Sequence, residues 1–262
     1  MHCHAGCSRD EVLAELHRLR LLDFAGSVGT PDPAELEQQR EAEKRRRMTR
    51  IADALDFWQR ETADPVGTTV ERYWSIRGLG DLPFPLTIRA AHSWLRHPEG
   101  GSRPAMVALV EHVAFGPVAI HRTYLAIDGS CKAAFRSPRL SLGPVGGATI
   151  RLAEARTDVP LIVGEGIETT ASAMLVMGWP GWAALSAGGI EALILPPLPL
   201  AATVFIAADH DPNGTGERAA RLAAERWIAE GRKVRIALPA EPGSDWNDVL
   251  LGKDRHRDAE GA

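Results

Sequence analysis

Several features of secreted and membrane proteins are missing from this sequence. Only three of its 262 residues are cysteine, an odd and small number that does not make a disulfide framework. No uninterrupted run of roughly 18 apolar residues is present. The N-terminal Met1-His2-Cys3-His4 lacks the charged and then apolar pattern of a signal peptide. We therefore expect a cytoplasmic protein with no membrane partner.

Excess positive charge and an ATPase phosphate loop are also missing. The chain has 30 Lys and Arg against 34 Asp and Glu, for a formal net charge of −4. It is therefore not a uniformly basic nucleic-acid binder, and a polyanion would be held by a local patch or through a metal ion. The sequence contains no Gly-x-x-x-x-Gly-Lys-Ser/Thr motif, so a helicase partner would have to be a separate protein.

The chain contains enough apolar residues to build one or two globular domains, because 45% of its residues are hydrophobic. Capping and periodicity predict a short amphipathic helix from Ser8 to about Leu22. The segments differ in composition, and we divide the chain into residues 1–25 with this helix, a charge-mixed helical linker over 26–66, a small Pro- and Gly-rich α+β unit with hairpins over 67–153 (the middle domain), an α/β unit over 154–254 (the C-terminal domain), and a disordered tail over 255–262.

The C-terminal domain alternates apolar runs with helical patterns. The runs that predict buried strands are Val159–Val163, Trp182–Leu185, Thr203–Ala207 and Val234–Leu238. Helix-compatible residues follow the first run, and a stripe of alanines with Trp227 lies between the last two. This alternation predicts the fold class α/β, with a Rossmann-like, doubly wound parallel sheet preceded by the small α+β unit and N-terminal helices.

Acidic residues follow three of the four predicted strands. Glu165 comes directly after the first strand, Asp209 and Asp211 after the third, and Asp245 after the fourth. Ligands of such sheets bind beyond the carboxyl ends of the strands, and carboxylate oxygens suit Mg²⁺. Each acid alone could instead be a helix N-cap or a turn residue. Their joint placement after three strands favours a shared metal site.

Three segments around these acids, Val163–Thr169, Ala208–Gly214 and Gly243–Leu250, together resemble the TOPRIM domain of bacterial primases, topoisomerases and related nucleases. They are most similar to the versions in primases and primase-helicases of phages, plasmids and other mobile elements. The resemblance implies that Glu165 is a general acid/base, and that Asp209 and Asp211 coordinate Mg²⁺ or Mn²⁺.

The third of these segments resembles the acidic third motif of primases. The resemblance adds Asp245 to the metal ligands and, less directly, Asn247 or Asp248. Primases often have a carboxylate where this chain has Asn247, which leaves the number of metal ions open.

The middle domain looks like the small basic subdomain that precedes TOPRIM in primases. Its basic residues would neutralise template or nucleotide phosphates, although any one of them could equally be solvated surface. They are Arg77, Arg89, His121, Arg122, Lys132, Arg136 and Arg139. A topoisomerase would also need a strand-cleaving tyrosine in a further domain, and only Tyr73 and Tyr124 are present.

The N-terminal His2-Cys3-His4-Ala5-Gly6-Cys7 and the helix after it resemble the second half of the zinc ribbon that precedes the catalytic core in these primases. A tetrahedral Zn²⁺ site needs four ligands, and the upstream Cys/His pair is missing before Met1. We therefore interpret Cys3 and Cys7 as the remnant of a truncated ribbon rather than a working Zn²⁺ site. A start further upstream would reverse this interpretation.

The resemblance predicts a DNA primase that makes short primers on a single-stranded DNA template by Mg²⁺-dependent transfer from nucleoside triphosphates, in replication of bacterial or mobile-element DNA. Two alternatives stay open. The same acids could serve a TOPRIM nuclease, because metal-held carboxylates also support phosphodiester cleavage. The half zinc ribbon also fits a catalytically inactive, nucleic-acid-binding fragment of a primase.

Overall fold

The computed structural model of the chain describes residues 8–18 and 33–252. The predicted zinc residues Cys3 and Cys7 and the predicted tail 255–262 lie outside the described residues. The chain divides into two compact units, residues 1–46 and 47–262. Among the described helices, none combines the length and the apolar character that crossing a membrane requires.

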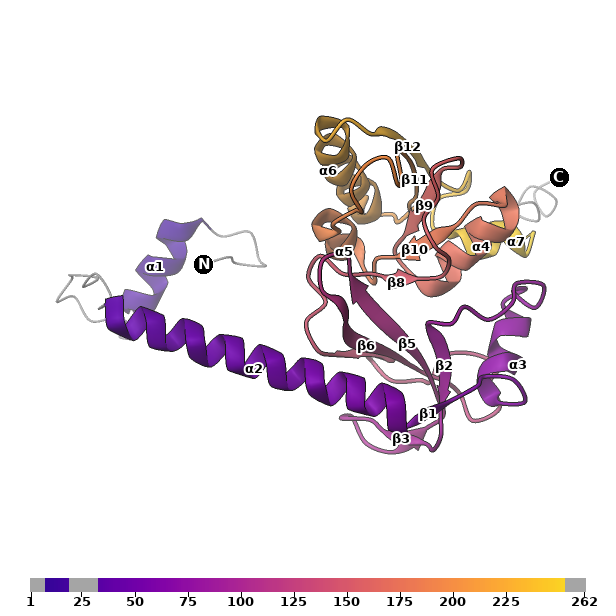
Figure 1. The fold of residues 1–262 in the computed structure, drawn as a ribbon, viewed down its shortest axis with the longest axis horizontal. Coiled ribbons are helices and arrows are strands. Elements are labelled where there is room, and N and C mark those ends of the chain that lie inside the picture. The colour runs from indigo at the N-terminus through magenta and orange to yellow at the C-terminus, as the bar shows by residue number, and fades with distance from the viewer. Residues whose placement is uncertain (1–7, 19–32, 253–262) are drawn as a thin grey trace. The chain divides into compact units, whose positions relative to one another are not determined.

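The helices include those predicted near the N-terminus, in the linker, after the first strand and between the last two strands, whereas α3 and α5 were not predicted (Figure 1). They are α1 Arg9–Arg18, α2 Pro33–Arg60, α3 Thr69–Ile76, α4 Ile167–Met177, α5 Ala187–Ala192, α6 Thr215–Ala229 and α7 Trp246–Leu250. The first unit contains α1 and the start of α2. Helix α2 begins with Pro33, which suits the first helical position, and continues through residues of high helix propensity such as Glu, Gln, Arg and Ala.

The first sheet is antiparallel and has the order β1-β2-β5-β6-β7, with a separate β3-β4 hairpin. It joins the strands of the middle domain to β1, which lies in the range 26–66 predicted as a helical linker. The strands are β1 Thr62–Ala63, β2 Ile88–Ala91, β3 Leu95–Arg96, β4 Ser102–Arg103, β5 Ala105–His112, β6 Gly116–Tyr124 and β7 Arg139–Leu142. Within the second unit, the end of α2 packs Ala54 and Trp58 against Val107 and Ile120 on one face of this sheet.

The second sheet has the order β12-β11-β9-β10-β8, and it includes β8, which comes before the range 154–254 predicted for the C-terminal domain. Its strands are β8 Ile150–Arg151, β9 Leu161–Gly164, β10 Gly181–Ala183, β11 Thr203–Ala207 and β12 Lys233–Ala237. The four strands predicted from the sequence pair in parallel. The edge strand β8 is antiparallel, which the sequence did not predict because two residues carry no readable pattern.

Helices cover both faces of this sheet, as the doubly wound prediction requires (Figure 1). Leu161 and Val163 of β9 pack with Trp227 of α6, whereas Ile162 between them packs with Ala171 of α4. This alternation follows from the two-residue period of a strand. The core on the α4 side also includes residues of the middle domain.

Candidate active site

The acidic residues gather at one edge of the parallel sheet. The register aligns Ala207, the last residue of β11, with Gly164 of β9 and Ala237 of β12. Glu165 and Asp209 therefore leave the sheet side by side. His210 fastens the loop that carries Asp209 and Asp211, because its Nδ1 lies 3.0 Å from the Pro239 carbonyl oxygen.

Asp209 and Glu165 lie in an environment that disfavours negative charge. Burial raises the pKa of Asp209 to about 7, with further contributions from the charges of Glu165, Asp245 and Asp211. Burial also raises the pKa of Glu165, helped by the charge of Asp211. Crowded, partly buried carboxylates of this kind are stabilised either by a proton or by a cation.

The two carboxylates also have unused hydrogen-bonding capacity. Glu165 Oε1 and Asp209 Oδ1 are buried and have no hydrogen-bond partner among the described residues. No three His, Cys, Asp or Glu side chains in the described parts of the chain already converge as a metal-binding group. Mg²⁺, however, is usually held by one or two carboxylates together with waters and phosphate oxygens. The Glu165 and Asp209 oxygens fit that smaller requirement.

Two neighbours of these acids were missed by sequence reasoning. The Thr169 side chain, in the first turn of α4, acts on the Asp209 carboxyl and lowers its pKa against the effect of burial. Gly216, in the first turn of α6, leaves room for the acid cluster, because a Cβ there would lie 2.9 Å from Glu165 Oε1 and 3.0 Å from the Asp209 carbonyl oxygen. A glycine inside the first turn of a predicted helix was the available signal.

The third acidic segment caps a helix. Asp245 Oδ1 accepts hydrogen bonds from the backbone N–H groups of Asn247 (2.8 Å) and Asp248 (2.9 Å), and Asp248 completes a capping box. The alternative that Asp245 is an N-cap is therefore confirmed, although its charge still acts on Asp209. Asn247 is buried, and its Nδ2 donates to the Arg77 carbonyl oxygen and to Ser172 Oγ, at 2.6 and 3.0 Å.

The predicted basic residues lie on both faces of the antiparallel sheet. The register places Arg89 of β2 and Arg122 of β6 in one row with Val107, which faces α2. Arg89 lies over the Trp58 ring, 4.6 Å from its centroid. Arg139 of β7 belongs to the next row and therefore points to the opposite face.

Arg139 and His121 meet the C-terminal domain on that opposite face. They line a small hollow together with Glu165, Glu168 and Leu185. His121 is buried beside Ser141 Oγ at 2.9 Å, and burial lowers its pKa to about 4, so the ring is neutral at pH 7. Arg139 is exposed and remains able to neutralise a phosphate near Glu165.

The other predicted cations differ in their surroundings. Lys132 Nζ lies 3.1 Å from Glu168 Oε1, and Arg77 Nη1 lies 3.4 Å from Asn247 Oδ1. Arg136 has an exposed side chain and a backbone N–H that donates to Glu99. Arg122 Nε is buried without a hydrogen-bond partner among the described residues. The basic residues that were predicted to bind phosphates therefore do not form one continuous patch.

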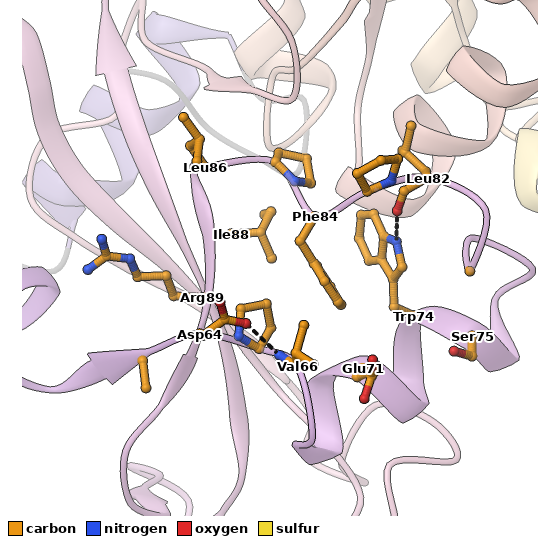
Figure 2. Close-up of a pocket in the computed structure, with 15 residues that line it drawn as sticks. Asp64, Val66, Glu71, Trp74, Ser75, Leu82, Phe84, Leu86, Ile88 and Arg89 are labelled. Carbon is orange, nitrogen blue, oxygen red and sulfur yellow. Dashed lines mark hydrogen bonds between the residues drawn. The ribbon is translucent and has the colours of Figure 1, made fainter.

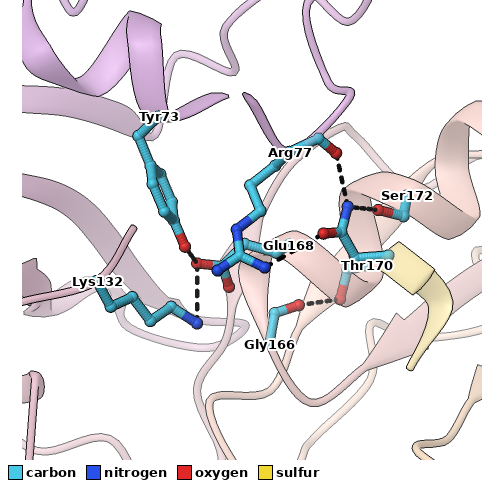
Figure 3. A network of polar contacts seen from close by, with 8 residues as sticks. Tyr73, Arg77, Lys132, Gly166, Glu168, Thr170 and Ser172 are labelled. Carbon is cyan, nitrogen blue, oxygen red and sulfur yellow. Dashed lines mark hydrogen bonds and ion pairs between the residues drawn. The ribbon is translucent and has the colours of Figure 1, made fainter. Parts of the chain in front are cut away.

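Figure 3 shows the polar network in which Lys132 takes part. The Tyr73 hydroxyl donates to Glu168 Oε1 at 2.6 Å. Burial alone would raise the pKa of Glu168, but the Lys132 charge and the Tyr73 hydrogen bond lower it to about 2. Burial and the Glu168 charge raise the pKa of Tyr73. Glu168 is therefore a buried carboxylate that is ionised at pH 7.

A separate cavity of about 620 Å³ lies between α3, β2 and the loop that joins them. Figure 2 shows Trp74 and Phe84 among the residues that line it. Their ring centroids are 5.3 Å apart. Its lining is mostly apolar and includes none of the acids at the sheet edge. The cavity therefore does not belong to the acidic site.

Two family models match separate parts of the chain. Residues 160–255 match the family model described as "Toprim domain", and residues 48–152 match one described as "Domain of unknown function (DUF7146)". A search of curated proteins gave no match.

Three similar solved structures are all of primases. A DNA primase domain from Pseudomonas aeruginosa is 18% identical with a TM-score of 0.40, over 63% of this chain and 54% of that one. The DnaG primase catalytic domain bound to ssDNA is 17% identical with a TM-score of 0.46, over 84% and 81%. The E. coli primase catalytic core is 15% identical with a TM-score of 0.39, over 87% and 73%. The chain thus spans about half the length of the first of these.

The matched segment and the acidic sheet edge are the same part of the chain. It begins just before β9, which Glu165 directly follows, and it includes the loops with Asp209 and Asp245. Residues 160–255 are therefore a TOPRIM domain, preceded in this chain by an α+β domain.

Proposed function

We propose that this chain is a primase-type nucleotidyltransferase that joins nucleoside triphosphates on a single-stranded DNA template. The observation that carries the proposal is the pair Glu165 and Asp209 at the edge of the TOPRIM sheet, each with one buried carboxylate oxygen that has no hydrogen-bond partner in the described parts of the chain. The exposed Arg139 of the preceding domain lies on the same side and adds a positive charge. Unsatisfied acids facing a cation suit the binding of a metal–phosphate group.

The roles of the individual residues follow from their surroundings. Asp209 and Asp211 would hold Mg²⁺ or Mn²⁺, with Asp245 adding its charge from the neighbouring loop. The ion, when bound, supplies charge neutralisation for the nucleotide phosphates and polarises the reacting phosphorus. Glu165, which burial makes more basic than an ordinary glutamate, would accept the proton of the 3′-hydroxyl as its oxygen bonds to the α-phosphorus of the incoming nucleotide and pyrophosphate leaves. Arg139 neutralises a phosphate oxygen beside Glu165.

The first test is primer synthesis by the purified chain with single-stranded template, labelled nucleoside triphosphates and Mg²⁺. We expect short products from the wild type and roughly 10³-fold less from Asp209→Asn/Asp211→Asn, because a bound cation supplies several kcal/mol of transition-state stabilisation. Asp158→Asn is the matched control. This exposed residue pairs with Arg156 before β9 begins, so its loss should change little.

Two outcomes would contradict the proposal. Metal-dependent degradation of the template without any added nucleotide would identify a nuclease that uses the same acids. Tight single-strand binding by a folded protein, with neither synthesis nor cleavage, would identify an inactive nucleic-acid-binding fragment.

A further inference from the structure

Helix α3 of the middle domain contacts the TOPRIM domain at two points (Figure 3). Tyr73 lies within α3, and Arg77 is the C-cap residue at the end of this helix. The Tyr73 hydroxyl donates to Glu168 Oε1 at 2.6 Å. The Arg77 carbonyl oxygen accepts a 2.6 Å hydrogen bond from Asn247 Nδ2.

Both contacts reach the helices that follow the acidic loops. Glu168 is in the first turn of α4, three residues after Glu165. The next residue, Thr169, acts on the Asp209 carboxyl and lowers its pKa. Asn247 is in the first turn of α7, two residues after Asp245. A shift of α3 would therefore displace the first turns that set the spacing of the acids.

We propose that Tyr73 and Arg77 are positioning residues, through which α3 fixes the geometry of the metal-binding acids of the TOPRIM domain. This inference rests on the proposed function, because it concerns the metal site of that function. Neither residue is among the proposed metal ligands. They act through Glu168 and Asn247, whose side chains are buried in the contact.

The energetics of the contact favour a role in orienting the metal-binding acids over a role in stabilising the contact between the domains. Glu168 is buried with Lys132 and Tyr73 as its partners, and a buried ion pair is often no more stabilising than well-packed apolar residues of the same volume. Hydrogen bonds that orient metal-binding groups, in contrast, commonly change metal affinity 10- to 100-fold when they are removed.

Asn247 gives a second, independent reason. Its amide N–H groups are matched to two acceptors, the Arg77 carbonyl oxygen and Ser172 Oγ. A carboxylate at this position has no N–H group to donate and would face the carbonyl oxygen. The Asn247 amide therefore links α7 to the end of α3 and to α4. The third acidic segment contributes the carboxylate of Asp245, and position 247 adds no second one.

The test compares the two tyrosines by direct Mn²⁺ binding, measured from the electron paramagnetic resonance signal of free Mn²⁺. Tyr73→Phe removes only the hydroxyl and should weaken Mn²⁺ binding about tenfold. Tyr124→Phe is the matched control, because its hydroxyl donates to the Arg96 carbonyl oxygen within the middle domain. It should leave Mn²⁺ affinity unchanged, whatever the two substitutions do to the melting temperature.

Equal Mn²⁺ affinity in Tyr73→Phe and Tyr124→Phe would overturn the inference. Priming by the wild type together with an unaffected Tyr73→Phe variant refutes the inference and leaves the proposed function standing. Tight Mn²⁺ binding that depends on Tyr73, without any primer synthesis, supports the inference and refutes the proposed function. A wild type that binds no Mn²⁺ refutes the inference and the metal-dependent mechanism together.

Asn247→Asp tests the second contact, with Asn247→Ala as the comparison that adds no charge. Both should weaken Mn²⁺ binding, and Asn247→Asp should lower the melting temperature more, because it places a carboxylate in a buried site. Tighter binding, or a second Mn²⁺ ion per chain in Asn247→Asp, would show that position 247 is a metal-ligand position. Both substitutions leave Tyr73 intact, so the tyrosine comparison stands if either one fails to fold.

Discussion

The two sheets of the second unit present charged groups in different ways. In the parallel sheet, the acids lie beyond the strand ends, where the register of β9 and β11 brings Glu165 and Asp209 together. In the antiparallel sheet, the basic residues lie along the strands, so adjacent residues point to opposite faces. Arg122 and Arg139 are consequently on opposite faces. The acidic cluster on the loops of the parallel sheet therefore faces Arg139 but not Arg122, because the strand register places the two arginines on opposite faces.

The largest effect that sharpens this comparison is expected from Gly216→Ala. The added Cβ would lie 2.9 Å from Glu165 Oε1 and would displace the carboxylate, and a misplacement of about 1 Å can cost roughly 100-fold in rate. Stability should change little, because Ala is favoured over Gly in a helix by about 1 kcal/mol. The measurement is the rate of primer synthesis, together with the melting temperature.

Gly188→Ala is the matched glycine control, because a Cβ at that position in α5 would meet nothing within 4 Å. Equal losses of rate in the two variants would show that the space beside Glu165 is not specifically required.

A smaller effect should separate the two faces of the antiparallel sheet. Arg139→Ala should lower primer synthesis about tenfold, since a hydrogen bond to a charged group contributes roughly 1.5–3 kcal/mol. Arg122→Ala, on the face toward α2, should stay within about twofold of the wild type. The readout is the synthesis rate at several salt concentrations. A larger loss from Arg122→Ala would mean that the α2 face carries the phosphates.

The smallest effect is expected in the pH dependence of stability. The pKa of Asp209 is raised from 3.8 to about 7, so the folded state holds this proton more tightly than the unfolded state. The resulting stabilisation is full below about pH 4 and is lost as the pH rises through about 7. Glu168, with its pKa lowered to about 2, contributes fully above about pH 4.5 and so does not vary in this range.

Metal-free wild type should therefore lose melting temperature between pH 5 and 8 relative to Asp209→Asn, by an amount on the order of a few °C. Added Mg²⁺ should restore most of the loss at pH 8. Thermal melts with and without Mg²⁺ measure both effects. A parallel pH profile for the two proteins would show that Asp209 is not the titrating group.

The same contrast explains what the sequence could and could not predict. The acids were predictable as a cluster because the end of a buried strand can be recognised in a sequence, and parallel strand ends share an edge. The sequence could not predict that Arg89 and Arg139 lie on opposite faces of the sheet. A change of one residue in the strand register moves every side chain of the strand to the other face. The strand β8 was missed because it is too short to have a period.

Long-range partners were equally invisible in the sequence. Glu168 looks like an ordinary acidic residue in the first turn of a helix, and nothing in the segment indicates that Tyr73 reaches it from 95 positions away. Asn247 could be placed next to Asp245, but its contact with Arg77 depends on how α3 packs. The roles predicted for Glu165, Asp209 and Asp211 stay predictions.

The core on the α4 side has a consequence for how the chain can be divided. Tyr73, Ile88 and Met106 of the middle domain share this core with Ile162 and Ala171 of the TOPRIM domain. A chain cut near residue 153 would expose both halves of one apolar interior. The two domains are separate in sequence but share one apolar core, so we expect them to unfold together and the TOPRIM domain to lose stability when it is transferred alone to another protein.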